Sequence, residues 1–172
     1  MKFKDLKKSL TEKINSCYIL SCSNDEEDLY LKASAKNNLI KAVIKEFKDL
    51  NLSVFPFENL EVNTLKKSLE TLPFMSEKRL VLIIESESKK NEQVVKFLAE
   101  YLKNPSETTV LVIDESVNSS FKNLEKLESV NLVDCSRLDR DILTSFVKKT
   151  CQTKDIQIEN DAVNKIIDFC DG

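Results

Sequence analysis

The most restrictive feature of this 172-residue sequence is that its only glycine, Gly172, is also its last residue. The Walker A loop, the dinucleotide-binding fingerprint and the kinase glycine-rich loop all need glycines, which allow close backbone approach to phosphates and left-handed turns. No such loop can be built upstream of Gly172. The sequence therefore excludes a glycine-dependent phosphate site in this chain.

Apolar runs and helical patterns alternate along the first part of the chain. Short, continuously apolar runs predict buried strands, and apolar residues at helical spacing predict helices between them. An N-terminal helical face is predicted from Phe3, Leu6, Leu10 and Ile14, strands at 18–20, 52–57, 80–84, 110–113 and 130–133, and helices at 28–50, 64–71, 91–102 and 118–127. This alternation predicts an α/β fold, a five-stranded parallel sheet with helices on both faces.

Three details of this pattern concern the ends of elements. Phe47 continues the apolar stripe of the 28–50 helix, which predicts that it is buried. Asn63 is the expected N-cap of the following helix. Pro56 predicts that the second strand lies at an edge of the sheet or ends there.

The pattern changes after Cys135. Residues 139–150 and 159–170 are typical of amphipathic helices, and no strand pattern follows. We therefore divide the chain into an α/β domain, residues 1–136, and the start of an all-helical lid domain, residues 137–172. Because two helices bury little apolar surface, we expect the chain to be part of a longer protein.

Composition narrows the chemistry further. The chain has five cysteines, no C-x-x-C pair and no histidine, so a metal site is not expected and a Cys–His catalytic pair is excluded within it. The net charge is −3 and the charges are well mixed, which argues against a basic nucleic-acid patch. No apolar run is long enough for a membrane span, and the N-terminus lacks a signal peptide's apolar core. We expect a cytoplasmic protein that does not bind membranes.

Two polar segments stand where a nucleotide-binding protein would hold its ligand. The loop SCSNDEED, residues 21–28, carries four acids and no glycine, so it would repel a triphosphate. The segment VLVIDES, residues 110–116, resembles a Walker B strand, in which Asp114 would orient Mg²⁺ and Glu115 would activate water. The alternative is a buried strand that ends in solvated acids, and without a phosphate loop the sequence favours that alternative.

An apolar loop is the other unusual feature. Leu72, Pro73, Phe74 and Met75 lie between a predicted helix and a predicted strand, next to charged residues. The pair Phe74 and Met75 either projects to solvent, as an anchor for a partner's apolar pocket, or packs under the sheet as a plug. The pattern alone favours the plug.

The segment LPFMSEKRLV, residues 72–81, resembles the delta subunit of the bacterial DNA polymerase III clamp loader. Three later segments are similar to the same family, in the same order: FLAEYLKNPSETTVLVIDES, VDCSRLDRDILTSFVKK and IQIENDAVNKIIDFCDG. Together they extend the resemblance over nearly the whole chain. The resemblance implies an AAA+-like fold whose nucleotide site has been lost, followed by a helical lid, with a collar domain beyond residue 172.

The resemblance also implies a role for the apolar loop. In that family an apolar pair at this position inserts into a hydrophobic pocket of the ring-shaped sliding clamp and helps to open the ring. The clamp-binding residues implied here are Leu72, Pro73, Phe74 and Met75, with rim contacts from Lys78 and Arg79.

The implied partners are the sliding clamp (beta), the delta-prime and gamma or tau subunits, and DNA through the assembled complex. No cofactor and no catalysis are expected from this chain itself, although the assembly belongs to a DNA-directed DNA polymerase holoenzyme, a nucleotidyltransferase. Two alternatives stay open: an AAA+ ATPase that uses Asp114 and Glu115, and a related non-hydrolysing subunit such as delta-prime.

Overall fold

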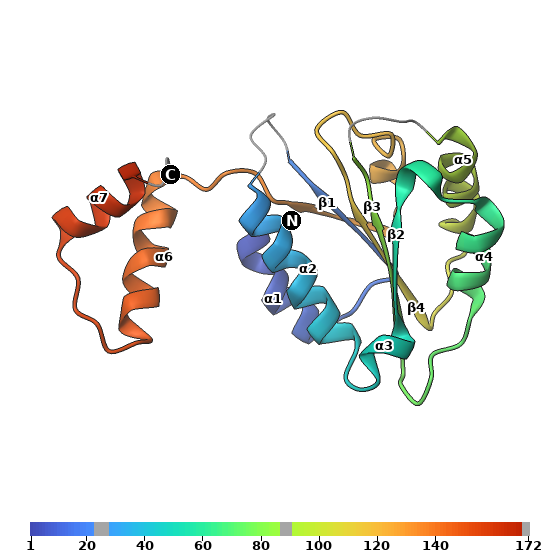
Figure 1. The fold of residues 1–172 in the computed structure, drawn as a ribbon, viewed down its shortest axis with the longest axis horizontal. Helices are drawn as coiled ribbons and strands as arrows, with labels where there is room; N and C mark the ends of the chain where they lie inside the picture. Colours follow the sequence, from blue (N-terminus) through green and yellow to red (C-terminus); the bar gives the residue numbers. More distant parts are fainter. Residues whose placement is uncertain (23–27, 87–90, 170–172) are drawn as a thin grey trace. The chain divides into compact units, whose positions relative to one another are not determined.

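The computed structural model describes residues 1–22, 28–86 and 91–169. The chain forms two compact units, residues 1–136 and 137–172. In the first unit a β-sheet lies between two layers of helices (Figure 1). The second unit is helical.

The sheet has five strands, all parallel, in the spatial order β2-β3-β4-β1-β5. The strands are β1 (Cys17–Ser21), β2 (Leu52–Pro56), β3 (Arg79–Ile84), β4 (Thr109–Asp114) and β5 (Val130–Asp134). β2 lies at an edge and ends at Pro56, which agrees with the prediction from Pro56, because proline has no N–H to donate to a neighbouring strand. The predicted fold class is confirmed.

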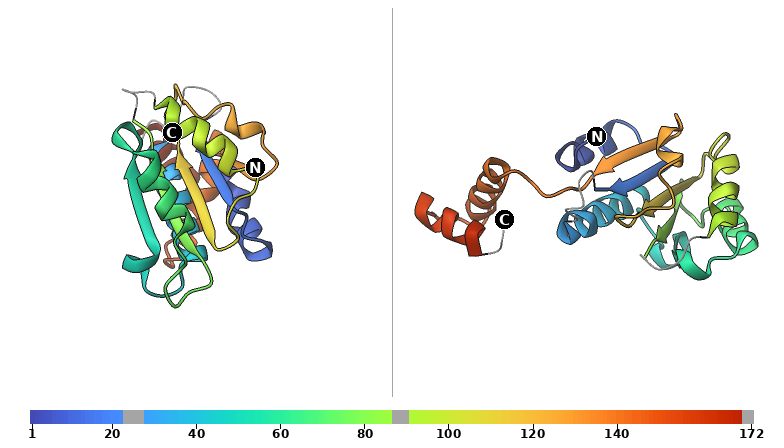
Figure 2. Two further views of the ribbon diagram at one scale, coloured as in Figure 1. Left: turned by 90° about the vertical axis from the view of Figure 1, so that its right-hand side faces the viewer. Right: turned by 90° about the horizontal axis from the view of Figure 1, so that it is seen from above.

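Helices cover both faces of this sheet. On one face lie α1 (Phe3–Glu12) and α2 (Leu29–Val43), and on the other lie α4 (Val62–Glu70) and α5 (Glu92–Tyr101) (Figures 1 and 2). A single turn, α3 (Lys48–Asn51), leads directly into β2, and short 3-10 turns occur at η1 (Phe57–Asn59) and η2 (Leu124–Lys126). No helix in the described ranges is long and apolar enough to cross a bilayer.

Helix starts follow the capping residues of the sequence in two cases. The Asp28 carboxylate accepts a hydrogen bond from the Leu31 amide at 3.0 Å, and the Asn91 side chain accepts one from the Val94 amide at 3.3 Å. Both satisfy an amide that the first helical turn leaves without a partner. The prediction of Asn63 as the N-cap is wrong, because α4 already begins at Val62. Asn63 is an exposed residue within that helix.

The core fills the space between the sheet and the α4–α5 layer. It includes a tilted aromatic pair, Phe57 and Phe121, whose ring centroids are 4.6 Å apart. The other fully or nearly buried members are Cys17, Ile19, Leu60, Leu65, Leu69, Val81, Ile83, Val94, Leu98, Leu102, Leu111, Ile113 and Leu124. The continuous apolar runs of the sequence thus become strands buried on both faces.

Two predicted helices differ from the structure. The 28–50 helix ends at Val43, and Phe47 is exposed with a left-handed backbone, φ 51°. Residues 118–127 form turns and η2 instead of a helix. Here the Ser119 hydroxyl accepts from the Phe121 amide at 2.9 Å, a local bond that competes with helical pairing, while the spacing of three between Phe121 and Leu124 suits a 3-10 turn.

The second unit consists of α6 (Arg140–Gln152) and α7 (Asn160–Phe169). Both agree with the predicted helices to within two residues at each end that the structure describes. Val163 and Ile167 are its buried apolar residues, and Arg140 Nη1 pairs with Asp168 Oδ1 at 2.6 Å on the surface.

We expect Phe121→Ala to lower the free energy of unfolding by about 3 to 5 kcal/mol, because it removes a fully buried ring and leaves a cavity against Phe57. The same substitution at the half-exposed Phe74 is the matched control and should cost less than about 1 kcal/mol. Urea unfolding of the three proteins measures both values. Equal losses would contradict this description of the core.

Candidate functional site

Two loops meet at the amino edge of the sheet. β2 and β3 are parallel neighbours, with Leu52 opposite Leu80. The segments that precede them, residues 44–51 and 71–78, therefore emerge side by side at the same edge. Figure 1 shows α3 and the loop before β3 at this end of the sheet.

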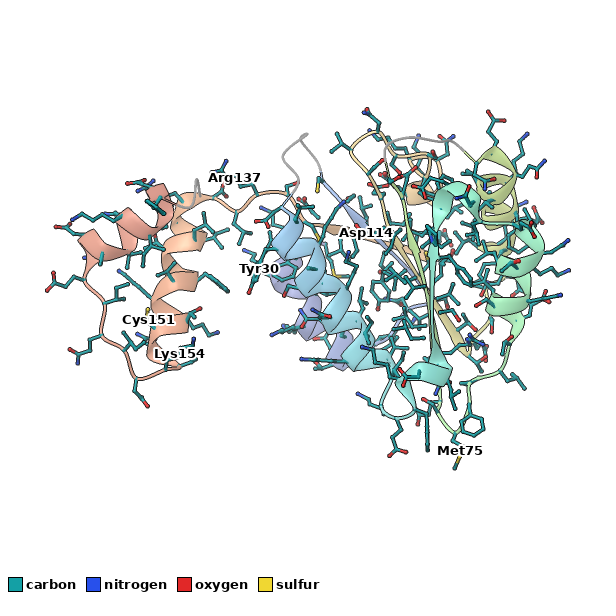
Figure 3. All side chains as sticks on the ribbon, viewed as in Figure 1. Tyr30, Met75, Asp114, Arg137, Cys151 and Lys154 are labelled. Carbon is teal, nitrogen blue, oxygen red and sulfur yellow. The ribbon has the colours of Figure 1, made fainter. Side chains whose placement is uncertain are left out.

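The apolar residues of the 71–78 loop are exposed. The relative exposure is 75% for Leu72, 49% for Phe74 and 72% for Met75, and Pro73 is half-buried. Figure 3 shows Met75 at the tip of the loop, where it projects beyond the sheet. The structure therefore has the exposed arrangement of this loop and not the plug that the pattern alone favoured.

The loop is tied to the segment before β2. Asn51 is fully buried, and its side-chain oxygen accepts from the Phe74 amide at 2.7 Å while its side-chain nitrogen donates to the Phe74 carbonyl at 2.9 Å. The rings of Phe47 and Phe74 are in edge contact, with centroids 5.6 Å apart and planes at 89°. The exposed aromatic ring thus sits on a backbone that is held from the neighbouring loop.

The two basic residues expected at the rim have different surroundings. Lys78 is half-buried, and its ammonium donates to the Glu107 carbonyl. Arg79 is buried at the start of β3, where Nη2 donates to the Ser53 hydroxyl at 2.8 Å. Burial lowers the pKa of the Arg79 guanidinium. Arg79 therefore supports the sheet edge and does not present its charge at the surface.

A groove of about 1090 Å³ opens beside Met75, between this loop and the helices α1 and α2. Its charged lining consists of Lys7, Lys41, Lys45, Lys78, Glu46 and Glu77. Four cations against two anions make its wall positive. Lys41 and Lys45 come from the end of α2 and the residues that follow it, far from the loop in sequence.

At the opposite, carboxyl edge of the sheet lie the two acids that resemble a Walker B pair. Asp114, labelled in Figure 3, is buried. Its carboxylate forms ion pairs with Lys36 and, at 3.3 Å, with Lys32, both from α2. The Lys32 ammonium also donates to the Glu115 carbonyl. The alternative of solvated acids is wrong, because both acids are buried.

A third acid completes this edge. Glu85, after β3, accepts hydrogen bonds from the backbone amides of Ser116 at 3.1 Å and Ser120 at 2.8 Å. The acidic loop predicted at residues 21–28 falls largely outside the described residues, which omit 23–27. At this edge, then, Asp114 is paired with lysines, whereas Glu85 is held by backbone amides.

Burial raises the pKa of the Glu115 carboxyl to about 7, and a hydrogen bond with Ser119 opposes this only in part. The folded pKa therefore lies above the ordinary value of 4.5. The protonated Glu115 carboxyl therefore contributes to the free energy of unfolding. This contribution is fully present below about pH 4.5 and is lost as the pH rises through about 7.

We expect the wild-type chain to lose stability relative to Glu115→Gln between pH 5 and 8, by on the order of 2 kcal/mol. The readout is clean because the chain has no histidine, the residue that ordinarily titrates in this range. Urea unfolding at half-unit pH steps measures the difference. Parallel stability curves for the two proteins would rule out a raised pKa at Glu115.

Within the described ranges, no three histidine, cysteine or acidic side chains gather as metal ligands. Cys17 and Cys135 are buried, and Cys22 Sγ donates to the Cys135 carbonyl at 3.7 Å.

The fold places the chain in a class of α/β proteins that includes clamp-loader subunits. A solved structure of the Bacillus subtilis DNA clamp loader delta protein superposes with a TM-score of 0.70 at 24% identity, over 96% of this chain and 51% of that one. A DNA polymerase III gamma subunit-related protein from Thermotoga maritima gives a TM-score of 0.55 at 14% identity, over 86% and 49%.

Sequence comparison gives the family. The family model described as DNA polymerase III, delta subunit, matches residues 26–136, and the chain belongs to this family. The DNA polymerase III subunit delta of Bacillus subtilis (strain 168) is 26% identical over 158 residues, which is 85% of this chain and 46% of that protein. The chain thus spans about half the length of the relatives it matches.

Sequence reasoning missed Asn51, Phe47 and Lys32 as contributors to these two edges. Lys32 sits inside the helical pattern of residues 28–50, where a polar residue is taken as solvent-facing, and Asn51 falls between that helix and the next strand. One signal was available for Asn51: it is a polar residue directly before a strand, where turns and caps are common.

Proposed function

We propose that this chain is the clamp-binding part of a clamp-loader delta subunit, and that residues 72–75 bind an apolar pocket on the sliding clamp. The observation that carries the proposal is the exposure of Leu72, Phe74 and Met75 on a loop anchored to the sheet. Large apolar side chains gathered at one exposed spot are typical of protein–protein contacts. Family membership supports the same role.

Phe74 and Met75 are the anchors of this contact. A ring that enters a pocket buries a large apolar area, and methionine adapts its shape to an irregular pocket. Pro73 restricts the backbone before Phe74, and Leu72 adds apolar area at the base of the loop. In most interfaces, a few residues of this kind supply most of the binding energy.

The positive groove wall extends the contact by charge. Lys78, Lys41 and Lys45 line the groove next to Met75 and suit an acidic rim on the partner. Rim charges of this kind raise the association rate and fix orientation more than they add affinity. Arg79 is left out of this set because it is buried.

Binding by this loop opens the clamp only through differential affinity. A loader subunit that binds the open or strained ring more tightly than the closed ring shifts the equilibrium by that difference and no more. ATP hydrolysis on the gamma or tau partners, with delta-prime, then controls when the loop is available. DNA contact and nucleotidyl transfer belong to the assembled holoenzyme in the cytoplasm.

The ATPase alternative predicts a different result with nucleotide. Asp114 is already paired with Lys32 and Lys36, so its carboxylate is not free to hold Mg²⁺. We expect titration of the chain with ATP and Mg²⁺, followed by calorimetry, to give no saturable binding up to millimolar nucleotide. Saturable binding in the micromolar range would favour the hydrolase.

We expect Phe74→Ala and Met75→Ala each to weaken binding to the sliding clamp of the same organism by at least about 1 kcal/mol, which is about fivefold in Kd. Each variant removes an apolar anchor and leaves the core intact. Calorimetric titration of the purified chain with the clamp, without ATP, measures the effect.

The matched control is Phe169→Ala, which removes an equally large ring that is 93% exposed on α7. It should leave the affinity unchanged. Wild-type affinity in both loop variants would remove the assignment of residues 72–75. Failure of the wild-type chain to bind the clamp at all would favour a non-binding relative such as delta-prime.

A further inference from the structure

We infer that Asn51 is a positioning residue, which holds the loop of residues 72–75 in its binding conformation without touching the partner. This inference rests on the proposed role of residues 72–75. Asn51 is the last residue of α3 and is fully buried, directly before the strand that pairs with β3. It lies on a different segment from the loop that it holds.

The hydrogen bonds of Asn51 fix the backbone of two segments, the one before β2 and the one before β3. Its amide group bonds both the N–H and the C=O of Phe74, at 2.7 and 2.9 Å, as a neighbouring strand would. Its side-chain nitrogen also lies 3.3 Å from the carbonyls of Glu46 and Phe47. One buried side chain thus joins residues 46–47 to residue 74.

This link makes one apolar surface from two loops. Phe47 and Phe74 are both exposed, and their rings meet edge to face. Leu50, on α3, is also exposed, in the same segment as Phe47. The partner surface that fits here is apolar and wide enough to contact Phe47 together with Phe74, with Met75 at its edge.

Backbone strain at Phe47 and Met75 explains why the loop needs a stabilising contact. Phe47 and Met75 have left-handed φ angles of 51° and 48°, which bulky residues disfavour and glycine accepts. Residues in such conformations persist when the surrounding structure holds them there. The two strained residues flank the Asn51–Phe74 contact, and no glycine is available before residue 172 to relax them.

Loss of the Asn51 amide therefore has two consequences. The Phe74 amide loses its acceptor, and the backbones of Phe47 and Met75 lose the contact that stands between them. The loop then samples conformations in which Phe74 and Met75 leave the positions that they hold here. Binding requires them to be ordered again, which lowers the affinity.

The test compares Asn51→Leu with Asn63→Leu in the full chain. Leucine keeps the number and branching of the heavy side-chain atoms of Asn51, with bulkier methyl groups, but removes every side-chain hydrogen bond. Asn63 is an exposed asparagine on α4 that serves as the matched control. Two readouts are used: hydrogen exchange of the Phe74 amide by NMR, and clamp affinity by calorimetry.

In the wild-type chain the Phe74 amide should be protected although its side chain is exposed. In Asn51→Leu its exchange should accelerate at least tenfold while the amides of β3 and β4 keep theirs, and clamp affinity should fall about tenfold. Asn63→Leu should change neither readout. This result would support the positioning role.

Unprotected exchange of Phe74 in the wild-type chain would overturn the inference without any variant, even if Asn51→Leu fails to fold. Wild-type clamp affinity in a folded Asn51→Leu chain would also overturn it. The failure of the proposed function is separate: Phe74→Ala would then bind the clamp like the wild type, whatever the exchange of the Phe74 amide.

Discussion

The parallel pairing of β2 with β3 is the interaction on which the proposed binding surface depends. Because the strands run in the same direction, everything that precedes them collects at one edge of the sheet. This places Phe47 and Asn51 beside Phe74 although the two segments are more than twenty residues apart. A loop that would be unsupported in a hairpin gains a rigid neighbour, and its apolar residues stay exposed without loss of order.

At the other edge of the sheet a buried acid is paired within the chain. The acid at the end of β4, in the segment that resembles a Walker B strand, pairs with two lysines of α2. A buried ion pair of this kind gives little net stability, yet it satisfies charges that would otherwise be costly. Asp114 therefore links α2 to the carboxyl edge of the sheet, and the fold by itself does not determine activity.

The sequence predicted the parts of this structure that depend on local pattern. The five strands were visible because parallel strands buried on both faces are continuously apolar, and the edge position of β2 followed from Pro56. The local pattern could not predict the exposure of Phe74, because a polar anchor on another segment decides it; only the family resemblance implied an exposed role. Likewise Phe47 fits a helical stripe in sequence, and only the tertiary turn after Val43 removes it from the helix.

The surroundings of the two basic residues before and at the start of β3 could not be predicted from the sequence either. Lys78 and Arg79 are adjacent and equally basic in sequence, but the start of β3 falls between them. Arg79 enters the sheet and bonds Ser53, while Lys78 stays in the loop. Only the exact end of the strand separates their roles, and strand ends are what pattern reasoning places least well.

Met75 carries opposing demands on one residue. Its main chain favours a glycine or an asparagine, and either would relax the turn. Neither offers the flexible apolar side chain that the loop presents to solvent. The position thus holds a residue that the local backbone disfavours, so selection for a more stable chain and selection for a better contact would act in opposite directions at this one site.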